Sequence, residues 1–150
     1  MERDLVGQAH AVFTATTARD WCDFLELIHP ECEAELRSQP GRIIRGREEM
    51  EAFVRGVIPT RVEHQMVPET IEQIGDDAVV ALGRLYMIDD QGTRDSPAGW
   101  LMLFEDGLLR RSYLVDSVEH GRSLLASLAS VDRSGRSDED LEEETAEPVA

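Results

Sequence analysis

The amino-acid sequence predicts an α+β domain in which helices pack against one side of a largely antiparallel sheet. Two observations lead to this fold class. In the first third of the chain, apolar residues recur at helical spacing, whereas beyond residue 62 they alternate with a period of two. Turn signals at residues 75–77, 89–92 and 105–107 divide the alternating part into strands joined by hairpins. A length of 150 residues fits a single domain.

Three helices are expected before the first long strand. The first spans 4–17, and the second spans 19–28, with Asp20 as its N-cap and Pro30 as the residue that ends it. The third covers 47–57. The residues expected on the buried faces of the first two helices are Leu5, Ala9, Val12, Phe13 and Thr16, followed by Trp21, Phe24, Leu25 and Ile28.

The strands begin with a short segment over 31–36, which is expected to turn Glu31, Glu33 and Glu35 toward solvent. Longer strands are expected at 62–74, with an interruption at Pro68, and at 78–88, 99–104 and 108–116. A short helix over 117–129 closes the domain.

The segment from Asp132 onward is dominated by acidic residues and has almost no large apolar side chains. Such a segment cannot bury enough surface to offset the entropy of ordering it. We therefore divide the chain into a folded domain over 1–131 and an acidic, disordered C-terminal tail over 132–150.

Charge and composition narrow the function classes. A formal net charge of −16 argues against nucleic acid and anionic membranes as partners, because both bind basic surfaces. No apolar run approaches the roughly 20 residues of a membrane helix, and the first residues lack the pattern of a secretory signal. These features predict a cytoplasmic protein. Cys22 and Cys32 lack a metal-binding spacing and are expected to be free thiols that fill the core.

The strands over 79–88 and 99–104 are apolar on both faces. Antiparallel sheets of small proteins usually leave one face polar, so something must cover the second face. The simplest cover is another copy of the chain, which predicts a homodimer that forms through the sheet.

Three stretches in this order resemble the NTF2-like superfamily and its SnoaL-like domain proteins. They are residues 19–31, which contain RDW and LIHPE; residues 44–50, IRGREEM; and residues 104–116, which contain FEDGLL and YLVD. The resemblance covers about residues 5–128. It implies a cone fold, in which N-terminal helices pack on the concave face of a strongly bent antiparallel or mixed sheet and enclose a pocket.

The resemblance also offers two comparisons with enzymes. In ketosteroid isomerases a carboxylate base and a tyrosine act in the pocket, and their positions correspond here to Leu36 and a place near Phe13, neither of which transfers protons. Limonene-type epoxide hydrolases use an Arg-x-Asp motif and a later aspartate. The corresponding residues here are Arg84, Tyr86 and Asp116, so that one acid is replaced by tyrosine.

These residues form the candidate catalytic site. Asp116 would transfer the proton, Arg84 would orient it or stabilise negative charge, and Tyr86 would hydrogen bond the substrate. An unpaired buried guanidinium is costly, so Arg84 is expected to pair with Asp116. A structural ion pair, or an arginine at the rim with its charge in water, is the alternative.

Four further residues are candidate binding residues: His29, His64, Trp21 and Trp100. Each has a structural alternative, since His29 could cap a helix end, His64 could be a hydrogen-bonded residue of the sheet, and the tryptophans could be core residues. No group of side chains predicts a metal site, and no cofactor motif is present.

Two functions are compatible with these features. The first is a dimeric protein that binds a small apolar organic ligand, with or without cofactor-free acid–base catalysis of the isomerase, cyclase or hydrolase type. The alternative is a non-catalytic dimeric module that binds another protein.

Overall fold

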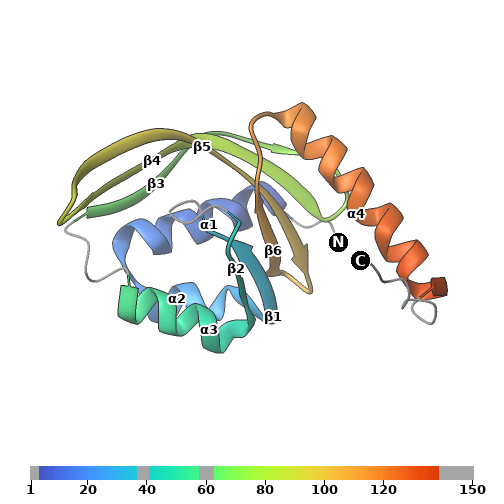
Figure 1. Cartoon of the computed structure of the whole chain (residues 1–150), viewed down its shortest axis with the longest axis horizontal. Helices are drawn as coiled ribbons and strands as arrows, with labels where there is room; N and C mark the ends of the chain where they lie inside the picture. The colour runs from blue at the N-terminus through green and yellow to red at the C-terminus, as the bar shows by residue number, and fades with distance from the viewer. Residues whose placement is uncertain (1–3, 37–40, 58–62, 139–150) are drawn as a thin grey trace, which may run out of the picture.

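The computed structural model describes residues 4–36, 41–57 and 63–138 and shows a curved six-stranded sheet that wraps around three helices (Figure 1). The strand order is β2-β1-β6-β5-β4-β3. The elements are α1 (Leu5–Ala18), α2 (Trp21–Glu26), β1 (Ile28–Glu35), β2 (Ile43–Arg45), α3 (Gly46–Ala52), the π-helical turn η1 (Phe53–Val57), β3 (Glu63–Gln73), β4 (Ala78–Asp89), β5 (Gly92–Glu105), β6 (Leu108–Leu114) and α4 (Val118–Asp138). The predicted α+β class and bent mixed sheet are confirmed.

The first two helices begin at aspartate caps, of which Asp20 was predicted. The side chain of Asp4 accepts a hydrogen bond from the Gly7 amide at 2.9 Å, and that of Asp20 accepts one from the Asp23 amide at 3.1 Å. These bonds satisfy amides that have no partner within the helix. All five residues of the predicted stripe on α1 are buried. None of the helices in the described part of the chain combines the length and apolar content needed to span a membrane.

The end of α2 was predicted wrongly. The helix ends at Glu26, and Ile28 already belongs to β1, so that Pro30 lies within a strand and does not end a helix. The cause is a contact from far along the chain, because the Leu109 amide donates a hydrogen bond to the Leu27 carbonyl at 2.9 Å. This bond starts the parallel pairing of β1 with β6.

The sheet is otherwise an antiparallel meander of β3, β4, β5 and β6, with β2 paired antiparallel to β1. The predicted interruption of β3 is confirmed, because the register of β3 against β4 shifts between Pro68 and Thr70. Gly83 faces this irregularity, where an added Cβ would lie only 1.9 Å from the Val67 carbonyl oxygen. β5 begins at Gly92, earlier than predicted, because it pairs with β4 along the whole length of that strand.

The two faces of β4 are both apolar, as predicted, but they have different covers. Val79 and Ala81 belong to the core that packs against the N-terminal helices, whereas Val80 belongs to a smaller cluster with Leu124 and Leu125 of α4. Figure 1 shows α4 on the opposite side of the sheet from α1. The same chain therefore supplies part of the cover that we assigned to a second copy, and the homodimer stays a prediction.

Helix α4 continues to Asp138, beyond the predicted end at Ala129. The first residues of the segment predicted to be a disordered tail are therefore helical. Residues 139–150 lie outside the described part of the chain, and the assignment of an acidic tail stays a prediction.

Candidate ligand-binding cavity

A cavity of about 100 Å³ lies between the N-terminal helices and the concave face of the sheet. Five aromatic residues line it: Phe13 on α1, Trp21 and Phe24 on α2, Phe53 on η1 and Trp100 on β5. Three methionines, Met50, Met66 and Met102, add flexible apolar surface from α3, β3 and β5. The lining is therefore suited to an apolar molecule.

Two pairs of aromatic rings shape the cavity walls. The rings of Phe13 and Trp100 lie 5.1 Å apart between centroids at 61°, and those of Trp21 and Phe24 lie 5.8 Å apart at 82°. Both arrangements are edge-to-face, a geometry that stabilises aromatic packing beyond the area that it buries. Trp21 and Trp100, two of the candidate binding residues, therefore line the cavity, while their role in binding stays a prediction.

Three polar residues interrupt the apolar lining: Thr16, Glu35 and Ser112. The Thr16 hydroxyl donates a hydrogen bond to the Val12 carbonyl at 2.8 Å. The Glu35 carboxylate accepts hydrogen bonds from the Leu114 amide at 3.0 Å and the Gly41 amide at 3.3 Å. The Ser112 side chain is not hydrogen bonded to any described residue.

None of these three residues was predicted from the sequence as part of a site. Glu35 was grouped with two acidic residues expected to face solvent, yet it lies at the end of β1, where its carboxylate reaches the backbone of β6. Thr16 was assigned to the buried stripe of α1, which gave no sign of a cavity. Ser112 and Asp116 both lie in the predicted strand over 108–116, where simple alternation would place their side chains on one face.

The alternation fails because β6 ends at Leu114. Beyond that residue the chain turns toward α4, so the side chain of Asp116 does not follow the face of Ser112. Instead it is 97% exposed, and its Oδ2 lies 3.8 Å from Nδ1 of His120.

The predicted ion pair between Arg84 and Asp116 is not formed. The Nε atom of Arg84 donates to Oδ1 of Asp95 on the neighbouring strand at 2.7 Å, and both side chains are about half exposed. Arg84 and Tyr86 alternate with the β4 residues that face the cavity, and neither lines it. The structure thus leaves Arg84, Tyr86 and Asp116 outside the cavity, and their catalytic roles stay untested predictions.

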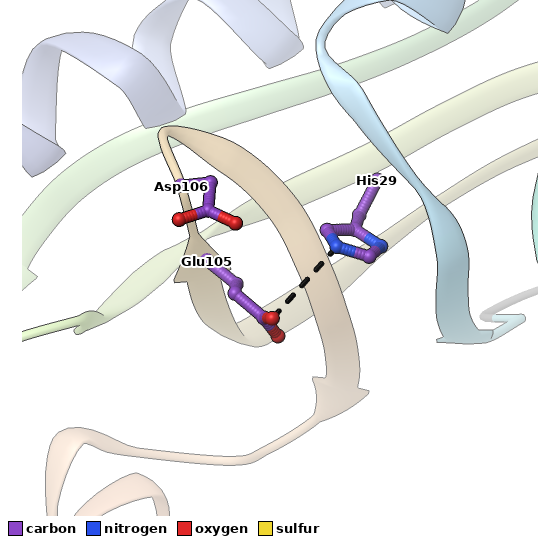
Figure 2. Close-up of side chains that lie close together, drawn as sticks. All are labelled: His29, Glu105 and Asp106. Carbon is purple, nitrogen blue, oxygen red and sulfur yellow. Dashed lines mark ion pairs between the residues drawn. The ribbon is translucent and has the colours of Figure 1, made fainter.

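The candidate residue His29 lies outside the cavity lining, beside Glu105 and Asp106 at the β5–β6 hairpin (Figure 2). One nitrogen or oxygen of each of these three side chains lies within 4.8 Å of the others, a spacing that a metal ion could bridge. Nδ1 of His29, however, accepts a hydrogen bond from the Glu31 amide at 3.0 Å. In a neutral ring the proton is then on Nε2, which lies 3.9 Å from the Glu105 carboxylate.

This placement leaves no lone pair on the ring nitrogen that faces the carboxylates. The Glu105 carboxylate already has a cation beside it, since Nε of Arg110 lies 3.5 Å from Oε1. The group therefore fits an exposed cluster of ion pairs better than a metal site. His64, the remaining candidate, pairs with Met87 across β3 and β4, and its side chain is not among those described.

Both cysteines are free, as predicted, but their surroundings differ. Cys32 is a buried residue of β1, and burial raises the pKa of its thiol. Cys22 is exposed on α2, and its sulfur lies 3.8 Å from a guanidinium nitrogen of Arg55. Cys32 is thus a core residue, whereas Cys22 is not.

Comparison with solved structures supports the fold. A Mycobacterium tuberculosis protein in complex with estradiol-17β-hemisuccinate matches with a TM-score of 0.65 and 16% identity, over 77% of this chain and 95% of that one. An NTF2-like protein of unknown function from Burkholderia pseudomallei matches with a TM-score of 0.65 and 17% identity, over 83% and 96% of the two chains. TerC, co-crystallised with polyporic acid, matches with a TM-score of 0.62 and 17% identity, over 81% and 98%.

No curated protein matches the chain in sequence. The model of the SnoaL-like domain family matches residues 9–112, which include most of α1, all of α2 and α3, and most of the sheet. The structural relatives share the same fold at low identity. The chain therefore belongs to the SnoaL-like domain family, within the NTF2-like superfamily that its sequence motifs resemble.

Proposed function

We propose that this protein binds a small, mostly apolar organic molecule in the cavity between its N-terminal helices and its sheet. The observation that carries the proposal is the lining, in which aromatic and methionine side chains surround three polar residues. Ligand sites in proteins typically combine an apolar wall with a few polar groups that orient the ligand. Two structural relatives were solved with organic ligands, estradiol-17β-hemisuccinate and polyporic acid, which favours the same type of ligand here.

The size of the cavity limits the ligand. A volume of about 100 Å³ lies below the range of roughly 300–1,000 Å³ that is usual for drug-sized ligands. An apolar cavity of about 150 Å³ accommodates benzene in another protein. A steroid would require the walls to move, and a molecule with one ring is the largest that fits with small adjustments of the methionines.

The proposal is for binding and not for catalysis. Among the described residues that line the cavity, Glu35 is the ionisable one, and both of its carboxylate oxygens accept backbone hydrogen bonds. The positions that correspond to the base and the tyrosine of ketosteroid isomerases are here Leu36 and a place near Phe13. Both Leu36 and Phe13 are buried and line the cavity as apolar residues.

Thermal unfolding in the presence of a panel of one-ring, two-ring and steroid compounds tests the proposal. A ligand at 100 times its Kd stabilises the folded protein by about 2.7 kcal/mol, so a one-ring member should raise the Tm by several degrees. The Ala34→Met variant places a larger side chain in the cavity wall and should lose this response. Val67→Met, which alters an exposed residue outside the lining, is the matched control and should keep it.

Two results would contradict the proposal. One is the absence of a saturable Tm shift for every compound in the panel. The other is an equal shift for the wild type and Ala34→Met, because the ligand would then bind elsewhere.

A further inference from the structure

Ser112 is the polar residue of the cavity lining whose side chain has no hydrogen bond to another described residue. It lies on β6 with Ala34 of β1 on one side and Met102 of β5 on the other, and all three residues line the cavity. The residue is only 9% exposed. No hydrogen bond joins its hydroxyl to the described part of the chain.

Within the described part of the chain, the polar side-chain atoms that are buried without a partner are Oε1 of Gln8 and Nε of Arg47. The Ser112 hydroxyl is therefore open to the cavity, where water or a ligand can bond to it. The other two polar residues of the lining differ from Ser112 in this respect. The Thr16 hydroxyl donates to the Val12 carbonyl, and Glu35 accepts from two backbone amides.

From this contrast we infer that the ligand is a one-ring phenol, and that Ser112 forms a hydrogen bond with its hydroxyl group. The inference rests on the proposed function and deepens it. The aromatic walls contact the ring, the cavity volume limits the molecule to one ring, and Ser112 provides one polar contact. Most of the lining is apolar, so a ligand with several polar groups would lose hydrogen bonds to water.

Ser112 can act as donor or acceptor toward a phenol, because a hydroxyl group has both capacities. Toluene has nearly the same shape as phenol but offers no hydrogen bond. The two compounds therefore separate the contribution of the Ser112 contact from that of the apolar walls. A site that hydrogen bonds a ligand hydroxyl discriminates against the analogue that lacks it.

The test measures the dissociation constants of phenol and toluene by isothermal titration calorimetry for the wild type and two variants. Ser112→Ala removes the hydroxyl, and we expect the preference for phenol over toluene to fall about tenfold, as the loss of one hydrogen bond implies. Ser96→Ala is the matched control, since it removes a hydroxyl of β5 outside the cavity lining. It should leave the preference unchanged. Thermal unfolding without ligand verifies that each variant is folded.

The outcomes distinguish this inference from the function on which it rests. If the wild type binds both compounds and Ser112→Ala keeps the same preference, the role of Ser112 is refuted while the binding function stands. An equal loss of preference in Ser96→Ala also overturns it, because the effect would not be specific to Ser112. If the wild type binds neither compound nor any larger member of the panel, the proposed function itself fails.

Discussion

The packing of α4 against the outer face of the sheet can be tested at Gly121. This residue is buried in the first turns of α4, and a Cβ added to it would lie 2.3 Å from Cγ2 of Val80. That distance is about 1 Å short of the 3.4 Å at which ordinary contact begins. Val80 is fully buried and has a β-branched side chain that rotates little, so the clash is not easily relieved.

We expect Gly121→Ala to lower the free energy of unfolding by about 2 kcal/mol. Overpacking costs about 3 kcal/mol at the upper end of its usual range. The higher helix propensity of alanine offsets about 1 kcal/mol of this cost. Val80→Ala alone should also cost about 2 kcal/mol through lost burial and a small cavity. The double variant should be at least about 2 kcal/mol more stable than the sum of the two effects predicts, because the smaller side chain removes the clash.

Urea unfolding monitored by tryptophan fluorescence gives these free energies. Gly56→Ala serves as the control, since no described atom outside its own stretch of helix lies within 4 Å of the Cβ that it adds. Its effect should simply add to that of Val80→Ala. A Gly121→Ala protein as stable as the wild type, or strict additivity in the double variant, would refute the packing of α4 on Val80.

Three further predictions concern single residues. Cys22 should react with a thiol reagent in the native protein, whereas Cys32, which is buried and has a raised thiol pKa, should react only after unfolding; mass spectrometry of the labelled chain locates the adducts. Burial, followed by the hydrogen bond to Glu33, raises the pKa of Tyr113, so the folded state holds this proton more tightly than the unfolded chain. The resulting stabilisation is present below the ordinary tyrosine pKa of about 10 and is lost as the pH rises above it. Unfolding curves measured on both sides of that pH should therefore show a smaller loss of unfolding free energy for Tyr113→Phe than for the wild type. Asp116→Leu should leave the affinity for the cavity ligand unchanged, because this side chain is 97% exposed outside the lining; a clear loss of affinity in calorimetry would restore Asp116 as a site residue.

The features that the sequence predicted well depend on residues close together in the chain. Asp20 caps α2 through an amide three residues away, and the buried stripe of α1 follows from helical spacing alone. The interruption of β3 near Pro68 is also local, because proline cannot donate a hydrogen bond to the sheet. Hydrophobic periodicity was enough to assign both apolar faces of β4.

The features that the sequence did not predict depend on contacts between distant segments. The early end of α2 results from the bond between Leu27 and Leu109, which no pattern within the helix reveals. The error at Asp116 has a related cause, since alternation predicts the direction of a side chain only as far as the strand continues. Ser112 became a candidate binding residue only because the structure shows that it lines the cavity and that Thr16 and Glu35, the other polar residues of the lining, have hydrogen-bond partners.

The parallel pairing of β1 with β6 also has a consequence for the order in which the chain folds. Arg110 reaches the Glu31 carbonyl across 79 positions of sequence, so β1 has no sheet neighbour on this side until nearly the whole domain has been synthesised. Closing a segment of that length is entropically costly, and proteins rich in such distant contacts fold slowly. On the ribosome, the β3–β5 meander is complete before β6 emerges, and the docking of β1 onto β6 therefore becomes a late step of folding.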